Sequence, residues 1–267
     1  FLAQCNDRAF ERNVQQIVAL GAYSHAAHKD LVRATGIEYH RLERGIAHFY
    51  SDQKSFDEAG HAVEVMRQHG VQRRLVSRDE LLAIEPAFNA YKEHITGGTY
   101  TTTDESGDAQ VFTQQLAERC AARGVQFLYG HDVVRLNTIG NAIDSVAVCA
   151  NQASAGGPKE QNIQADAVVV ACGSYSAPLL RSVGVDLPIY PGKGYSATFP
   201  LLRPEGAPMV STIDDGRKLA MSRLGNVLRV AGTIELGGFD LSLDTPVARA
   251  RCHMLSRRIE EVLPGVC

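Results

Sequence analysis

Three residues in the last third of the chain, Lys193, Tyr195 and Arg223, have side chains that could bind a small carboxylate. Lys193 and Tyr195 lie two positions apart in a predicted strand, so both side chains project from the same face. Arg223 lies in the next predicted hairpin, and arginine binds a carboxylate through two parallel hydrogen bonds. The alternative interpretation is solvent-facing charge on the open side of a sheet, which needs no ligand.

A second candidate site follows the run 167–172, in which every residue is apolar. A strand without polar alternation is covered on both faces, so we expect a buried parallel strand here. The turn formed by Cys172, Gly173 and Ser174 then leads into a helix for which Ser176 is the expected N-cap. Such a turn can present backbone N–H groups to an anion, although it also occurs as a plain connection.

Other motifs lack the context that their chemistry needs. The string GKGYSA at 192–197 matches a dinucleotide-binding G-x-G-x-x-A pattern, but a strand follows it and not a helix. His25 and His28 have no carboxylate or cysteine at a metal-ligand spacing, so we expect surface histidines and no metal site. The 27 Lys and Arg against 30 Asp and Glu give a formal net charge of -3, which does not favour nucleic acid as a partner.

The composition is that of a globular protein. The 267 residues are 45% hydrophobic and 21% charged, and at about 150 residues per domain this length predicts roughly two domains. No apolar run approaches the roughly 18 residues of a membrane-spanning helix. The six cysteines are scattered without a C-x-x-C spacing, and no secretory leader is recognisable, which together predict a reducing compartment, the cytoplasm.

Capping signals and periodicity predict the elements that position these residues. Asn6 and Gly36 bound a long helix whose apolar residues recur at three-to-four spacing. Ser77 and Glu80 form a capping box at the start of another. Further helices are expected at 56–68, after Asp108, and after Thr245 with Pro246 in its first position. Strands are expected at 37–43, 45–51, 72–77, 125–130, 132–137, 143–149, 187–199, 218–224 and 227–233, with a surface loop at 151–162.

The order of these elements indicates the fold class. Helices are mixed with strands at first, a buried strand–turn–helix follows, and an antiparallel meander comes after it. This order predicts a mixed α/β (α+β) protein with a discontinuous two-domain architecture, in which the chain crosses between domains more than once.

Five segments carry a resemblance to a known family. They are DESGDAQVFTQQLAERC, GVQFLYGHDVVRL, ADAVVVACGSYSAPLL, IYPGKGYSAT and RVAGTIELGGFD. In this order they resemble the D-amino-acid-oxidase-like FAD flavoproteins, and within that family the small subunit of bacterial D-amino-acid dehydrogenases. The resemblance covers essentially the whole chain. VVVACGSYS and YPGKGYS are specific to the dehydrogenase subgroup, whereas the D-x-x-G-D segment is shared more widely.

The resemblance implies an FAD enzyme that oxidises a free D-amino acid to an imine, which water converts to a 2-oxo acid and ammonia. It implies that electrons then pass to an acceptor of the respiratory chain. The backbone of Val133 would meet the adenine, and Cys172, Gly173 and Ser174 would lie near the nucleotide. Lys193, Tyr195 and Arg223 would belong to the sheet that covers the substrate. No residue is assigned as catalytic.

The resemblance also implies a division of roles along the chain. A partial FAD-binding domain would comprise 1–36, 100–186 and 245–267, and a substrate-binding domain 37–99 and 187–244. Family members begin with a strand and a G-x-G-x-x-G turn and end with an Arg- and Gly-rich segment, and neither is present in this sequence. We therefore expect a central part of a longer protein that binds FAD weakly or not at all and is inactive alone.

Two alternatives stay open. One is a related FAD amine oxidase acting on glycine or sarcosine, and the other is a non-catalytic scaffold that binds a small molecule. Respiratory coupling would imply peripheral contact with the inner membrane, although no strongly basic amphipathic helix is evident. The sequence predicts neither the preferred D-amino acid nor the oligomeric state.

Overall fold

A computed structural model of the chain describes residues 5–151 and 160–267, so that part of the expected loop at 151–162 lies outside the described residues. The chain packs into two compact units. Unit 1 comprises Phe1–Cys120, Gly194–Ile234 and Ser242–Cys267, and unit 2 comprises Ala121–Lys193 and Glu235–Leu241. The chain thus crosses between units more than once, as expected. Which ranges form an FAD-binding or a substrate-binding domain stays a prediction.

Helices α1, α3, α4 and α6 of unit 1 begin at the predicted caps, whereas α2 begins at Gln53 with Asp52 as its cap, three residues before the predicted start. In α1 (Asp7–Thr35), the Asn6 side chain accepts from the Ala9 N–H, and Gly36 ends the helix with φ 61°, a left-handed conformation that favours glycine. Ser77 and Glu80 form the complete capping box of α3 (Arg78–Ile84). The remaining helices are α2 (Gln53–Gln68), a 3-10 helix at Pro86–His94, α4 (Ala109–Ala121), capped by Asp108, and α6 (Pro246–Val262), capped by Thr245.

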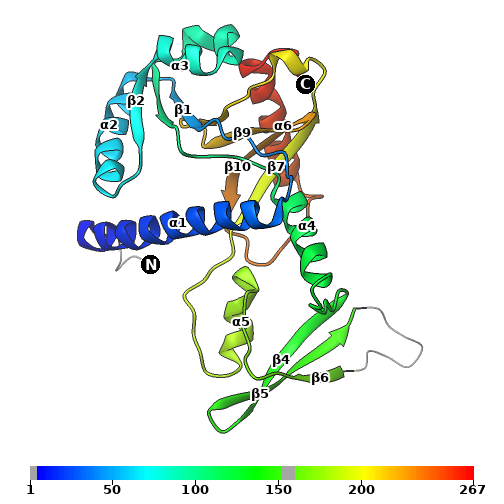
Figure 1. The fold of residues 1–267 in the computed structure, drawn as a ribbon. Coiled ribbons are helices and arrows are strands. Elements are labelled where there is room, and N and C mark those ends of the chain that lie inside the picture. Colours follow the sequence, from blue (N-terminus) through cyan, green and yellow to red (C-terminus); the bar gives the residue numbers. More distant parts are fainter. Residues whose placement is uncertain (1–4, 152–159) are drawn as a thin grey trace. The chain divides into compact units, whose positions relative to one another are not determined.

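Unit 1 is built on a seven-stranded mixed sheet with the order β2-β3-β1-β8-β9-β10-β7 (Figure 1). Its strands are β1 (Ile46–Tyr50), β2 (Arg73–Ser77), β3 (Gly97–Thr101), β7 (Lys193–Pro200), β8 (Ser211–Asp214), β9 (Leu219–Leu224) and β10 (Val227–Glu235). The central pair β1 and β8 is parallel, whereas β2, β3 and β1 pair antiparallel on one side and β8, β9 and β10 on the other. The expected antiparallel meander is confirmed in β8, β9 and β10.

Helix α6 covers one face of this sheet, which we call the helix-covered face. Phe49 and Leu228 from the sheet and Leu255 from α6 are fully buried in one cluster there. Among these apolar side chains the Arg258 guanidinium of α6 donates from Nε to Oδ2 of Asp214 over 2.7 Å. Both charged side chains are almost fully buried. Each charge is stabilised by the other, and removing one would leave the other buried without a partner.

Unit 2 contains a three-stranded antiparallel sheet and one short helix. The strands are β4 (His131–Ile139), β5 (Ala142–Ala150) and β6 (Glu160–Gln164), in that order. A 3-10 turn at Gly173–Tyr175 leads into α5 (Ser176–Arg181), which contacts β4.

Two predicted strands of unit 2 are wrong. Residues 125–128 and 167–172 are in neither strand nor helix, and Val169 is 88% exposed. A strand forms only where a neighbouring strand completes its backbone hydrogen bonds, and within the described residues no strand lies beside either run. The strand predicted at 37–43 is also wrong, because only the isolated bridge between Leu42 and Ser106 forms there.

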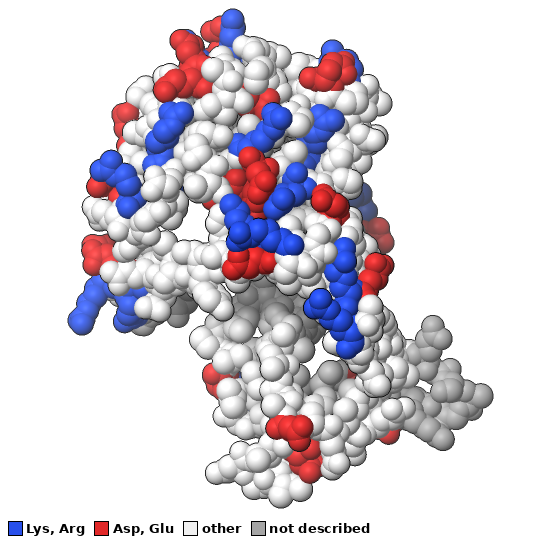
Figure 2. All heavy atoms as spheres, viewed as in Figure 1, with Lys and Arg blue, Asp and Glu red and all other residues white. Residues whose placement is uncertain are grey.

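The mixed α/β class predicted from the sequence is confirmed by this fold. No helix in the described part of the chain is long and apolar enough to cross a membrane. On the face shown in Figure 2, basic and acidic side chains are interspersed over unit 1. This distribution agrees with the small net charge of the sequence.

Candidate functional site

The structure brings two of the predicted nucleotide-binding residues to one cavity within unit 2. Val133, at the start of β4, and Cys172, just before the 3-10 turn, line a cavity of about 530 Å³. The other lining residues are His131, Asp132, Val134, Tyr175, Pro178 and Leu179. The contact between α5 and β4 therefore creates the cavity that the sequence analysis predicted only as two separate segments.

The turn beside this cavity differs from the prediction in its capping. Gly173 has φ 55°, which explains a glycine there. Ser176 is not the N-cap but the first residue of α5, and its Oγ accepts from the Cys172 N–H over 3.1 Å. The Cys172 N–H therefore already has an acceptor and is not available to an anion. Ser174, half-buried, lies in the 3-10 turn and does not line the cavity.

The cavity has mostly apolar walls. Its walls include the valines 133 and 134, Pro178 and Leu179, against which a planar apolar ring system can pack. The lining contains neither Lys nor Arg, and α5 has only six residues. A pyrophosphate needs positive charge or several free N–H groups, and the lining of this cavity contains no Lys or Arg to hold it.

The predicted substrate residues lie on or next to the helix-covered face of the sheet in unit 1. Tyr195 is 4% exposed in the core cluster, and the Arg251 guanidinium carbon lies 5.1 Å from its ring centroid. Arg223 pairs with Leu228 across β9 and β10, so it projects from the same face as the buried Leu228. Lys193 is half-buried at the first position of β7.

The Arg223 guanidinium already has acceptors within its own chain. Its Nε donates to the Gly225 carbonyl over 3.0 Å, and its Nη1 donates to the Pro204 carbonyl over 2.8 Å. These bonds hold the side chain in one position and leave part of its donor set for another acceptor, since a guanidinium carries five N–H groups. Binding of a carboxylate by Lys193, Tyr195 and Arg223 stays a prediction.

A polar cluster that the sequence analysis did not single out lies on the opposite face of the same sheet. His48 on β1 contacts Arg73 on β2, with 3.3 Å between His48 Nε2 and Arg73 Nη2. Its Nδ1 lies 3.4 Å from Oδ1 of Asp215, and Oδ2 of the same carboxylate accepts from the Lys218 ammonium over 2.7 Å. Arg73, Asp215, Lys218 and Tyr50 line a cavity of about 460 Å³.

The surroundings of His48 favour its neutral form. Burial lowers the pKa of His48 below its ordinary value, and the positive charge of Arg73 lowers it further, although Asp215 opposes both. Arginine has no acceptor, so Nε2 must accept from Arg73 and Nδ1 must carry the proton that faces Asp215. Burial likewise raises the pKa of Tyr50, which keeps the neighbouring phenol protonated.

The sequence carries only a weak signal for this cluster. His48 and Tyr50 alternate in a short strand, which places them on one face. Their partners come from β2 and from the turn after β8, and no local pattern indicates that these segments meet.

Comparisons with known proteins define the class. Residues 4–267 match the family model of the FAD-dependent oxidoreductases of the DAO type. This chain therefore belongs to that family of flavoproteins, as the resemblance predicted.

Sequence relatives within the family point to one subgroup. The chain is 47% identical over 264 residues to a D-amino acid dehydrogenase of Dechloromonas aromatica, and 38% identical over 264 residues to one of Methylobacterium radiotolerans. Each similarity covers 99% of this chain but 61% and 60% of the relative. The chain thus spans about three-fifths of the length of these relatives.

Solved structures share the fold. An L-proline dehydrogenase from P. horikoshii matches with a TM-score of 0.73 and 16% identity, over 91% of this chain and 61% of that one. A glycine oxidase from Geobacillus kaustophilus matches with a TM-score of 0.69 and 22% identity, over 93% of this chain and 62% of that one. At these identities the similarity establishes the fold alone.

Proposed function

We propose that the protein, in its longest natural form, oxidises free D-amino acids with FAD as the cofactor. The observation that carries this proposal is the 47% identity, over 99% of the chain, to a protein named D-amino acid dehydrogenase. FAD, when bound, accepts the hydride from the α-carbon of the amino acid. The amino acid becomes an imine, and water converts the imine to a 2-oxo acid and ammonia.

Within this proposal the chain's own residues bind and orient. The backbone of Val133 meets the adenine, and Cys172, Gly173 and Ser174 border the nucleotide. The cavity at Val133 and Cys172, with its apolar walls, supports this part of the proposal. Lys193, Tyr195 and Arg223 belong to the sheet that covers the substrate. The fixed position of the Arg223 guanidinium supports direct binding by that residue, whereas Tyr195 is buried in the core and its burial does not support direct contact.

We also propose that the 267 residues alone bind FAD weakly and turn over no D-amino acid. The lining of the cavity in unit 2 has no Lys or Arg to hold a pyrophosphate. The apolar runs at 125–128 and 167–172 have no strand beside them in the described structure, although their composition is that of covered strands. In this proposal, polypeptide equivalent to the remaining two-fifths of the relatives supplies the cation for the pyrophosphate and the strands beside these two runs.

Electron transfer to a respiratory acceptor and peripheral contact with the inner membrane are further parts of the proposal. Both rest on the resemblance to the dehydrogenase subgroup. Reduction of a quinone by the purified protein, measured with a D-amino acid and without dioxygen, tests the first part. Co-sedimentation of the protein with vesicles of anionic lipid tests the second.

Turnover under anaerobic conditions with an artificial electron acceptor tests the oxidation itself. The longest natural form, loaded with FAD, should oxidise D-alanine, and L-alanine should be inert. Preference for glycine or sarcosine would instead identify a related amine oxidase. Calorimetric heat with a D-amino acid in the absence of flavin, together with no turnover, would identify a binding scaffold.

The amount of flavin bound tests whether the nucleotide site of the 267-residue chain is incomplete. The 267-residue protein, purified in the presence of excess FAD, should show little flavin absorbance after gel filtration. Near-stoichiometric flavin would contradict the proposal that the nucleotide site is incomplete.

A further inference from the structure

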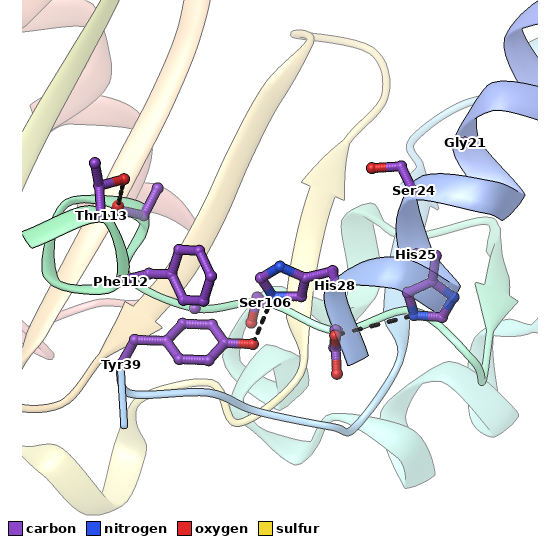
Figure 3. A pocket seen from close by; sticks show the side chains of 11 residues that line it. Gly21, Ser24, His25, His28, Tyr39, Ser106, Phe112 and Thr113 are labelled. Carbon is purple, nitrogen blue, oxygen red and sulfur yellow. Dashed lines mark hydrogen bonds and ion pairs between the residues drawn. The ribbon is translucent and has the colours of Figure 1, made fainter. Parts of the chain in front are cut away.

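A cavity of about 500 Å³ lies within unit 1, between the second half of α1 and the segment that enters α4 (Figure 3). Gly21, Ser24, His25 and His28 line it from α1, because positions i, i+3, i+4 and i+7 share one face of a helix. Tyr39 and residues from 105 to 113 form the other walls. A cavity of this size holds a small molecule.

Three buried side-chain atoms at this cavity lack a hydrogen-bond partner among the described residues. They are both carboxylate oxygens of Glu105 and Nε2 of His25. The Glu105 side chain is only 10% exposed, and its Oε1 lies 4.0 Å from His25 Nε2, within reach of an ion pair with a protonated His25 but too far for a hydrogen bond (Figure 3). Burial removes the hydration of a carboxylate, and a hydrogen-bond donor has to replace it. A ligand with several donors would complete the hydrogen bonds of Glu105.

The walls next to these acceptors are aromatic. The ring of Phe112 lies 4.7 Å from that of His28 and 5.2 Å from that of Tyr39, and Tyr39 Oη and His28 Nε2 are joined by a 2.9 Å hydrogen bond (Figure 3). Burial, with help from the negative charge of Glu105, raises the pKa of Tyr39, so the phenol is neutral. Aromatic faces attract organic cations and pack against apolar substituents.

Gly107 of the D-E-S-G-D segment explains how the aromatic wall comes so close to the acceptors. A Cβ at this position would overlap the ring of Tyr39. The glycine thus allows the segment that carries Glu105 to lie directly against Tyr39.

The charges of the lining select the kind of ligand. The cavity is lined by an acidic residue and two histidines, and no Lys or Arg is among the residues that line it. A primary ammonium group has three N–H donors and a positive charge, so it can bond to both oxygens of Glu105. A carboxylate on the same molecule would meet no Lys or Arg among the lining residues and would be repelled by Glu105.

We propose that this cavity binds a primary amine that carries an apolar or aromatic substituent and no carboxylate. Its ammonium group donates to Glu105, and its substituent packs against Phe112 and Tyr39.

Calorimetric titration of the chain with 2-phenylethylamine tests the site. We expect saturable binding of the amine. Binding of 2-phenylethanol, which lacks the charge, and of D-phenylalanine, which adds a carboxylate, should be weaker by about tenfold or more. Equal binding of either compound, displacement of the amine by equimolar sodium or potassium ions, or no binding of the amine at millimolar concentration would overturn the proposal.

A substitution at Gly21, with a control at Ala19, tests whether the amine binds in this cavity. A Cβ at Gly21 meets nothing within 4 Å, so Gly21→Leu fills the cavity without a clash and replaces a helix-weakening glycine. It should abolish binding without lowering Tm. The control Ala19→Leu lies on the opposite face of α1 and should bind normally.

Glu105→Gln tests the charge and keeps the shape. It should weaken binding of 2-phenylethylamine by about tenfold or more while leaving the weak binding of 2-phenylethanol unchanged. Unchanged amine binding in both Gly21→Leu and Glu105→Gln would show that the amine binds elsewhere, and the proposal would be wrong.

Discussion

The two units differ in how completely each buries its own apolar residues. In unit 1, Phe49, Leu228 and Leu255 are fully buried between a sheet and a helix that belong to the same unit. In unit 2 the buried apolar residues among those described are Leu136, Ala147, Val148 and Ala177. Many of its large apolar residues are exposed, including Val125, Leu128, Tyr129, Ile139, Val169, Val185, Ile189, Tyr190, Leu236 and Leu241.

The difference shows that the described part of unit 2 has a smaller apolar core than unit 1, although α1 of unit 1 also exposes Phe10, Ile17, Leu20 and Tyr23. Burial of apolar surface is the main favourable term in folding, and contiguous exposed apolar surface marks a place where another surface belongs. The chain spans about three-fifths of its relatives, which agrees with cover that comes from additional polypeptide. Substitutions that probe one unit should therefore give effects that the other does not.

The largest difference is expected at the buried ion pair of unit 1. Arg258→Ala removes the partner of the buried Asp214 and should lower the free energy of unfolding by about 3–5 kcal/mol, because an uncompensated charge stays buried. Urea unfolding followed by circular dichroism measures this. The control Arg257→Ala, exposed on the same helix, should change stability by less than about 0.5 kcal/mol. Equal losses of stability in Arg258→Ala and Arg257→Ala would show that Arg258 does not stabilise the buried charge of Asp214.

Matched truncations of apolar side chains compare the two units directly. Leu228→Ala leaves a cavity in the core of unit 1 and should cost about 2–5 kcal/mol. Ile139→Ala removes a side chain that is 71% exposed on β4 of unit 2 and should change stability by less than about 0.5 kcal/mol. The same urea titrations serve here. A large cost at Ile139 would show that unit 2 buries this residue and would break the comparison.

A smaller effect is expected at the helix cap of unit 1. Ser77→Ala removes the hydroxyl that accepts from the Glu80 N–H over 3.2 Å and should cost about 1 kcal/mol. Ser77→Asp keeps an acceptor at the cap and should restore most of the loss in thermal unfolding. Failure of the aspartate to rescue would argue that the serine acts through packing and not through its hydrogen bond.

The smallest effect is a change in the pH dependence of unit 1. The folded state holds the pKa of His48 below its unfolded value of about 6.5, so the unfolded chain binds the proton more readily. The contribution of His48 to the free energy of unfolding is therefore present above the unfolded pKa. It is lost as the pH falls from the unfolded pKa towards the folded pKa. Between pH 7.5 and 5, His48→Asn should reduce the slope of unfolding free energy against pH. An unchanged slope would contradict the neutral state assigned to His48.

Local signals in the sequence predicted the starts of α1, α3, α4 and α6, although they missed the Asp52 cap of α2 and misplaced the cap of α5. Asn6, Ser77, Asp108 and Thr245 cap the predicted helices, because each cap bonds to an N–H two or three residues further along and needs no distant partner. The order of motifs also identified the family, since the five quoted segments lie in one chain in the order that the family has.

Tertiary structure decided whatever depends on residues far apart in the chain. The apolar runs at 125–128 and 167–172 have the composition of strands, yet a strand exists only where a neighbour completes its hydrogen bonds. The cluster of His48, Arg73 and Asp215 forms because β2 and the turn after β8 meet β1, and the cavity at Glu105 forms because α1 passes beside α4. Hydrogen-bond partners and charge neighbours of this kind are properties of the packed chain, and no short stretch of sequence contains them.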